Sequence, residues 1–209
     1  MIWVGVDEAG RGPVVGSMFV AAVALKDEDL EKLRRLGLTD SKKLTPKKRA
    51  LLKEVIKEKA LAIEIVEVKP EEMNERSVSD LTIEAMRKAL ESVLKRVRAD
   101  VVIADVVGKG KKQAEILGKL HPNVKVLPKA DSEYLVVSAA SVVAKEAREE
   151  HVRKLKAKYG DFGSGYPSDK RTREWLVNNY DKPIVRRKWK TLQRVLSKQS
   201  SSSDEGHLT

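Results

Sequence analysis

Five stretches of the chain carry the hydrophobic patterns of β-strands. Residues 2–7 and 61–68 alternate between apolar and other side chains, as a half-buried strand does. Residues 14–25, 100–104 and 124–127 are largely apolar runs bounded by turn residues, which favours further strands. The run Gly10-Arg11-Gly12-Pro13 separates the first two strands, because glycine and proline interrupt regular structure.

Helical patterns fill most of the remaining chain. Thr45 followed by Pro46 is typical of a helix start, and an apolar stripe runs along residues 80–97. The small residues 138–141 favour close packing of the longest predicted helix. The predicted helices cover residues 27–36, 46–59, 80–97, 111–120, 133–158, 169–180 and 184–198, and the polar residues 200–209 are predicted to be disordered.

This order of elements predicts an α/β fold. Three early strands followed by alternating strands and helices indicate one mixed sheet with helices on both faces, its two later strands parallel. We expect a catalytic domain over 1–180, a basic C-terminal helix over 181–199 packed on it, and a tail over 200–209.

Composition narrows the kind of partner and metal. A net charge of +11 over 209 residues indicates a polyanionic partner. The absence of cysteine excludes disulfides and argues against a structural zinc site, so any metal should be a hard cation bound by carboxylates. No apolar run spans a membrane and the N-terminus lacks signal-peptide features, so we expect a cytoplasmic protein. Charged residues at 35% favour a thermophilic source.

Four acidic residues stand beside apolar segments, and each has two interpretations. Asp7 and Glu8 follow a strand, where they are either metal ligands or solvated turn residues. Strand alternation sends them to opposite faces unless the chain bends near Ala9. Asp105 ends another strand, where it is either a metal ligand or a turn residue. Asp131 precedes a helix, where it is either a metal ligand or the N-cap of that helix.

Basic segments offer candidate phosphate contacts. The turn of Gly10, Arg11 and Gly12 could bring backbone N–H groups to a phosphate or a sugar hydroxyl, or could simply join two strands. Residues 182–198 hold seven basic and no acidic side chains, which indicates phosphate contact. Trp189 among them is interpreted as a packing anchor.

Together these segments resemble ribonuclease HII, a type 2 ribonuclease H, of the archaeal kind. The resemblance covers residues 4–196. It rests on Gly5-Val6-Asp7-Glu8-Ala9-Gly10-Arg11-Gly12-Pro13, Asp40-Ser41-Lys42-Lys43-Leu44, Asp105, Lys129-Ala130-Asp131, Val137-Ser138-Ala139-Ala140-Ser141 with Ala144-Lys145, and Gly163-Ser164-Gly165-Tyr166-Pro167-Ser168-Asp169.

The resemblance implies a ribonuclease H-like five-stranded mixed sheet and a nuclease of DNA replication and repair. It implies cleavage of RNA in RNA–DNA hybrids and at single ribonucleotides in duplex DNA, with two Mg²⁺ or Mn²⁺ ions and 5′-phosphate and 3′-hydroxyl products. The implied catalytic and metal-binding residues are Asp7, Glu8, Asp105 and Asp131, and the implied substrate-binding residues are Gly10, Arg11, Gly12, Lys42, Lys43, Lys145 and Tyr166.

Two other functions remain open on the sequence. A non-catalytic protein that binds structured RNA fits the charge but gives no reason for acids at strand ends. Another two-metal nuclease or recombinase on the same fold would cut DNA without needing ribose. The tail lacks the glutamine-plus-aromatic peptide that binds a sliding clamp, and we expect a monomer.

Overall fold

A five-stranded mixed sheet forms the centre of the protein, as the pattern predicts. The computed structural model describes residues 1–190 and 192–198. The strand order is β3-β2-β1-β4-β5, in which β1 is antiparallel to β2 and parallel to β4. Strand β2 pairs with β3 in antiparallel orientation, and β4 pairs with β5 in parallel orientation. The strands are β1 Ile2–Ala9, β2 Met18–Lys26, β3 Ala62–Val68, β4 Val101–Asp105 and β5 Val124–Leu127.

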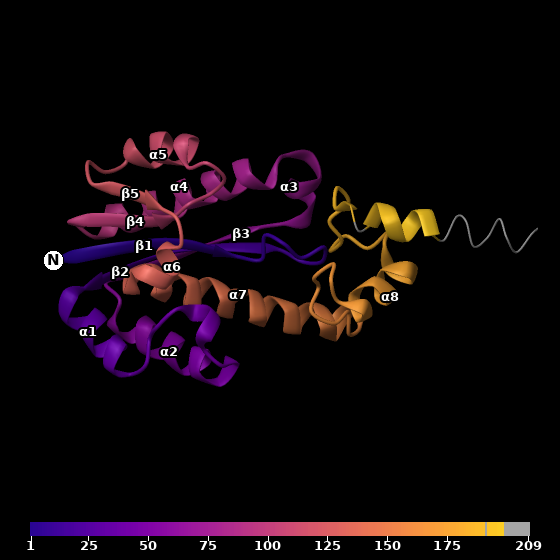
Figure 1. Cartoon of the computed structure of the whole chain (residues 1–209), viewed down its shortest axis with the longest axis horizontal. Coiled ribbons are helices and arrows are strands. Elements are labelled where there is room, and N and C mark those ends of the chain that lie inside the picture. The colour runs from indigo at the N-terminus through magenta and orange to yellow at the C-terminus, as the bar shows by residue number, and fades with distance from the viewer. Residues whose placement is uncertain (191, 199–209) are drawn as a thin grey trace, which may run out of the picture.

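Helices cover both faces of this sheet (Figure 1). One face packs against α3 (Pro70–Glu75), α4 (Val78–Arg96) and α5 (Lys111–Gly118). The other face packs against α1 (Asp27–Arg35), α2 (Pro46–Lys59) and α7 (Leu135–Tyr159). The short helix η1 (Ser41–Lys43) precedes α2. Two hydrophobic cores therefore sandwich the sheet.

Side-chain alternation along β1 separates its two faces. Val4 and Val6 are fully buried in the core beneath α4. Gly5 faces α7 so closely that a Cβ atom added to it would lie 2.1 Å from the carbonyl oxygen of Val136. Because alternate residues share a face, Asp7 also lies on the α7 side. The close approach of α7 to β1 therefore involves Val136 and Val137, which precede the predicted small residues 138–141.

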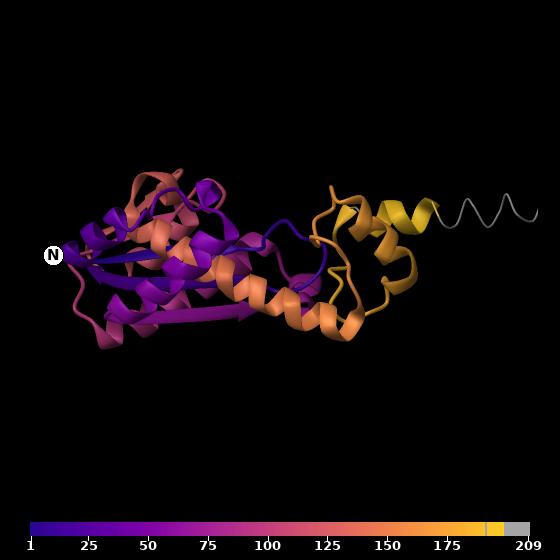
Figure 2. The ribbon, with the colours of Figure 1, turned by 90° about the horizontal axis from the view of Figure 1, so that it is seen from below.

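A third hydrophobic cluster lies at the far end of α7, beyond the sheet (Figure 2). It joins α8 (Lys170–Asn179) and helical residues 192–198 to Val14, Val15 and Phe162. The predicted second strand over 14–25 is correct only from Met18, because residues 14 and 15 belong to this cluster instead.

The predicted helix over 184–198 is wrong in its first half. Val185 forms an isolated antiparallel bridge with Val15, and the amide of Gly16 donates to the carbonyl of Ile184 at 2.8 Å. Helical structure is assigned at Lys190 and at 192–198. The β-branched residues before Arg186 pair with the early chain, so tertiary contact overrides the basic, helix-like composition.

The predicted helix over 133–158 is observed as α7 (Leu135–Tyr159), and a short helix that was not predicted precedes it. The short α6 (Ala130–Glu133) begins after Lys129, whose φ of 52° is left-handed, and α7 begins after the extended residue Tyr134. The predicted tail over 200–209 lies outside the described residues. Among the described residues, no helix is both long and apolar enough to cross a membrane.

Candidate active site

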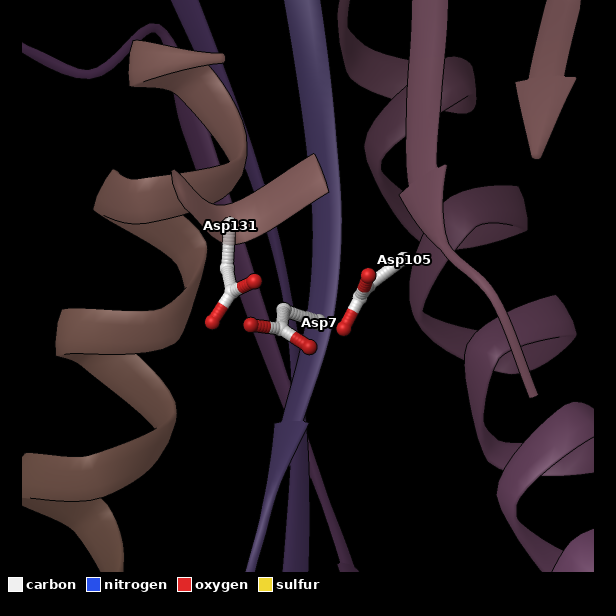
Figure 3. Close-up of side chains that lie close together, drawn as sticks. All are labelled: Asp7, Asp105 and Asp131. Carbon is white, nitrogen blue, oxygen red and sulfur yellow. The ribbon is translucent and has the colours of Figure 1, made fainter. Parts of the chain in front are cut away.

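Three carboxylates from distant parts of the chain meet at one edge of the sheet. Asp7, Asp105 and Asp131 each place one carboxylate oxygen within 4.8 Å of the other two. Figure 3 shows Asp7 on β1 between Asp105 of β4 and Asp131 of α6. Such a group of oxygen ligands fits a hard divalent cation, and it brings together three of the four acids that the family resemblance implies as metal ligands.

The parallel pairing of β1 and β4 brings Asp7 and Asp105 together. The pairing of β1 with β4 ends at Val6 and Ala104, so each aspartate is the next residue along its own strand. The carboxylate of Asp105 accepts a hydrogen bond from the amide of Ala130 at 3.1 Å, which fixes the start of α6 against β4. Because Asp131 lies within α6 and Tyr134 precedes α7, Asp131 is not the cap of the long helix.

Glu8 lies in the same cleft but outside this group of three. The strand β1 stays paired with β2 through Glu8 and Ala9, so no bend separates Asp7 from Glu8. The predicted bend comes one residue later, at Gly10, whose φ is 91°. Glu8 therefore reaches the cleft from the opposite face of the strand, and it lines the cleft together with Asp7.

Burial and mutual repulsion disfavour ionisation of these acids. Burial, followed by repulsion from Glu8 and Asp105, raises the pKa of Asp7 well above its ordinary value. Burial and the charge of Asp131 raise the pKa of Asp105. Burial also raises the pKa of Glu8, although the cation of Arg11 opposes that shift. A bound cation would offset these costs.

Two predicted lysines lie near the acids and one does not. The ammonium of Lys42 is 3.9 Å from the carboxylate of Asp131. Lys145 donates at 2.8 Å to the buried hydroxyl of Ser41, and burial is the main cause that lowers its pKa. Lys43 is exposed on η1 and is not among the residues that line the cleft.

The cleft extends from the acids to the predicted substrate-reading turn. Its volume is about 570 Å³, and its lining includes Gly10, Arg11, Gly12 and Tyr166. A Cβ atom on Gly12 would lie 3.3 Å from the ring of Tyr166, so the turn and the ring are neighbours. The side chain of Arg11 donates to the hydroxyl of Ser79 at 3.0 Å. The structure thus brings the predicted turn and tyrosine together.

Two buried arginines behind this turn were not predicted. Arg148 and Arg186 are 7% and 0% exposed and donate to the backbone between residues 10 and 17. Arg186 belongs to the basic stretch 182–198, whose composition predicts phosphate contact and not burial. Its placement after Ile184 and Val185 was the only signal in the sequence that it could be buried.

We expect the stabilisation of the protein by Mg²⁺ or Mn²⁺ to increase with pH. The raised pKa values of Asp7, Glu8 and Asp105 mean that the metal-free folded state loses stability as pH rises above about 4. A cation binds the deprotonated carboxylates and removes that penalty. Melting temperatures measured with EDTA and with Mg²⁺, from acidic to neutral pH, check this expectation.

In that experiment the difference between the two melting curves should be small where the acids are protonated and largest at neutral pH. Asp7→Asn serves as the control, because it removes the most strongly shifted group and should reduce the pH dependence. A metal-induced shift of equal size at every pH would contradict the expectation.

Comparisons with known proteins identify the family of this chain. The family model described as ribonuclease HII matches residues 4–192. The ribonuclease HII of Pyrococcus furiosus is 41% identical, with 98% of this chain and 95% of that protein covered. The crystal structure of ribonuclease H2 from Pyrococcus horikoshii OT3 superposes with a TM-score of 0.86 at 38% identity, covering 95% of this chain and 98% of that one.

A second solved structure is the PCNA:RNase HII complex from Archaeoglobus fulgidus, with a TM-score of 0.80 at 34% identity over 90% of this chain and 95% of that chain. The matches extend over nearly the whole sequence and include the strands and helices that carry the three carboxylates. The chain therefore belongs to the ribonuclease HII family of metal-dependent ribonucleases H, which hydrolyse the RNA strand of RNA–DNA hybrids.

Proposed function

We propose that this ribonuclease also cuts duplex DNA at single embedded ribonucleotides and so acts in DNA replication and repair. The observation that carries the proposal is one cleft that holds a carboxylate cluster, the Gly10–Gly12 turn and Tyr166. The cluster is suited to phosphodiester hydrolysis. The turn and the phenol are suited to recognise one 2′-hydroxyl, which is the group that distinguishes RNA from DNA.

In this proposal Asp7, Glu8, Asp105 and Asp131 hold two Mg²⁺ or Mn²⁺ ions. The all-oxygen donor set and the raised carboxyl pKa values support that assignment. Two such ions supply Lewis-acid stabilisation of the attacking and leaving oxygens in an in-line displacement, which gives 5′-phosphate and 3′-hydroxyl ends. Glu8, on the other face of β1, completes the acidic wall of the cleft.

The cationic residues around the acids are proposed to hold the nucleic-acid backbone. Lys42 and Lys145 line the cleft on the side of η1 and α7. Lys43 is one residue further along η1, where its exposed ammonium could reach the next phosphate of a bound duplex. Such contacts position a duplex and read no sequence, so they favour substrates of any base composition.

The two alternative functions account for less of the structure. A protein that only binds RNA gains nothing from three clustered, partly buried carboxylates inside a chain of net charge +11, because they repel phosphate. A nuclease that ignores ribose has no use for a glycine turn against an exposed tyrosine. Duplexes with zero, one or several ribonucleotides, incubated with Mg²⁺, separate the three functions. Cleavage of the all-DNA duplex, or a failure to cleave any of the three kinds of duplex, would refute our proposal.

We expect Tyr166 to matter most on a duplex with one ribonucleotide. Tyr166→Phe keeps the ring and loses the hydroxyl, so cleavage should fall by about five- to tenfold, the equivalent of one hydrogen bond. Tyr166→Ala also loses the ring that lies against Gly12, so its cleavage should fall further. The measurement is the initial rate for each folded variant on the same duplex.

Tyr180→Ala is a suitable control, because Tyr180 is 42% exposed, like Tyr166 at 44%, and is not among the residues lining the cleft. Parent-like cleavage by Tyr166→Ala would make Tyr166 a residue that only packs its loop.

We also propose that the protein is a monomer and that its tail carries no clear clamp-binding peptide. The second part rests on the composition of residues 200–209, which contain no glutamine and no phenylalanine, tyrosine or tryptophan. One relative, from Archaeoglobus fulgidus, is solved as a complex with PCNA, so the point needs a direct test. Sedimentation of the protein alone and mixed with a clamp would decide it.

A further inference from the structure

Arg186 directs all three of its donor nitrogens at backbone carbonyls of the early chain. Its Nη2 donates to the carbonyl oxygen of Gly10 at 2.7 Å, and its Nη1 to that of Arg11 at 3.0 Å. Its Nε donates to the carbonyl oxygen of Gly16 at 2.8 Å. The side chain is fully buried, and its guanidinium lies 5.0 Å from the centre of the Trp189 ring.

The neighbouring side chains continue this set of contacts. Trp189 donates from Nε1 to the carbonyl oxygen of Gly12 at 3.1 Å. Arg148, which comes from α7, donates to the carbonyl oxygens of Ser17 at 2.9 Å and Val15 at 3.1 Å. Six carbonyl groups between residues 10 and 17 are therefore held by three side chains.

The two guanidiniums are buried without a carboxylate partner. Among the described residues, neither Arg148 nor Arg186 forms an ion pair with a carboxylate, and burial lowers the pKa of both. Burying a cation costs free energy, and the hydrogen bonds to the carbonyls offset part of that cost. What the guanidiniums add is a fixed direction for each carbonyl that they bind.

That direction determines where the amides of the turn point. All described peptide bonds are trans, so the N–H of each unit points opposite to its carbonyl. Holding the carbonyls of Gly10 and Arg11 toward Arg186 turns the N–H groups of Arg11 and Gly12 away from it. Among the described residues, these two N–H groups have no acceptor, and both residues line the cleft beside Tyr166.

We infer that Arg186 is a positioning residue that presents the Arg11 and Gly12 amides to the ribose 2′-hydroxyl, so that selection of a ribonucleotide depends on the C-terminal segment. This inference rests on the proposed function of the Gly10–Gly12 turn. It assigns to residues 184–189 a role different from the phosphate contact expected of them as a basic surface.

Measurements of binding affinity, made in the absence of catalysis, test the inference directly. Fluorescence anisotropy in EDTA would give the affinities for two DNA duplexes that are identical except for one ribonucleotide. The ratio of these affinities measures the recognition of the 2′-hydroxyl. We expect Arg186→Met to reduce that ratio about tenfold, since two oriented hydrogen bonds are lost, while affinity for the all-DNA duplex changes much less.

Two variants control for other effects of the substitution. Arg187→Met removes one positive charge from the adjacent, exposed position, so it reports general loss of phosphate attraction. Val185→Ala removes buried volume from the same segment and leaves every donor in place, so it reports destabilisation. Both should bind with the ratio of the parent, whatever happens to overall affinity or melting temperature.

Arg186→Lys is the variant to measure if Arg186→Met does not fold. Lysine keeps the charge and the stem but cannot hold three carbonyls in the geometry of a guanidinium, so the ratio should fall to an intermediate value. If a folded variant at position 186 keeps the affinity ratio of the parent, the inference about Arg186 is wrong, whereas the proposed recognition by the turn is unaffected. A parent protein with no preference for the ribonucleotide would overturn both the inference and the proposed recognition by the turn.

Discussion

Replacing Asp105 by asparagine is expected to lower Mg²⁺-dependent cleavage by roughly 10³-fold or more, because it removes one member of a group that acts as a unit. The fold should survive. The amide of Ala130 donates to an oxygen of Asp105, and asparagine can supply an oxygen at the same place. Steady-state rates on an RNA–DNA hybrid, with circular dichroism of the same sample, measure both outcomes.

Without metal, Asp105→Asn should also melt at a higher temperature than the metal-free parent. Burial and the charge of Asp131 raise the pKa of Asp105, so the ionised side chain destabilises the protein at neutral pH. Glu150→Gln is the matched control. It too removes one negative charge, from an exposed side chain of α7 that is paired with Lys154 at 3.3 Å and does not line the cleft, and it should cleave like the parent. Near-parental cleavage by Asp105→Asn would remove Asp105 from the proposed catalytic set.

The largest expected loss of stability follows from a single methyl group on β1. In Gly5→Ala the new carbon would stand 2.1 Å from the carbonyl oxygen of Val136 and 2.8 Å from the amide nitrogen of Val137. Both neighbours are helix backbone and cannot rotate away, so α7 must move as a body. We expect a loss of about 3 kcal/mol in the free energy of unfolding, measured by denaturant titration.

Cleavage should fall as well, since α7 follows directly on the helix that carries Asp131. Gly118→Ala, at the end of α5, is the control. A Cβ atom there would meet nothing within 4 Å, and alanine favours a helix, so stability should stay equal or rise by up to about 1 kcal/mol. Equal stability of Gly5→Ala and the parent would mean that α7 can move away from β1 at no cost.

The sequence predicted the parts of the fold that depend on local pattern. Alternation and short apolar runs identified the strands, and the order of elements identified a mixed sheet. Asp105 stands at the end of a buried strand, where ligands gather in parallel sheets, but that position alone left a turn residue as the other interpretation. The family resemblance then implied roles for Asp7, Glu8, Asp105, Asp131 and Tyr166 that no spacing rule would have given them.

The features that were missed depend on contacts between distant residues. The left-handed backbone of Lys129, after which α6 begins and places Asp131 inside a helix of its own, has no signature in the side chain of lysine. Nor does a basic stretch reveal which of its members is buried. Arg186 became distinct from Arg187 only when the partner carbonyls at the other end of the chain were known.

The bonds between Arg186 and the early turn also bear on how the protein matures during synthesis. Gly10 and Arg186 are 176 residues apart, so the turn cannot be secured until nearly the whole chain has left the ribosome. The three aspartates need only the first 131 residues and the elements around them. A nascent chain can thus assemble its acidic cluster first, and it acquires the means to hold the turn last.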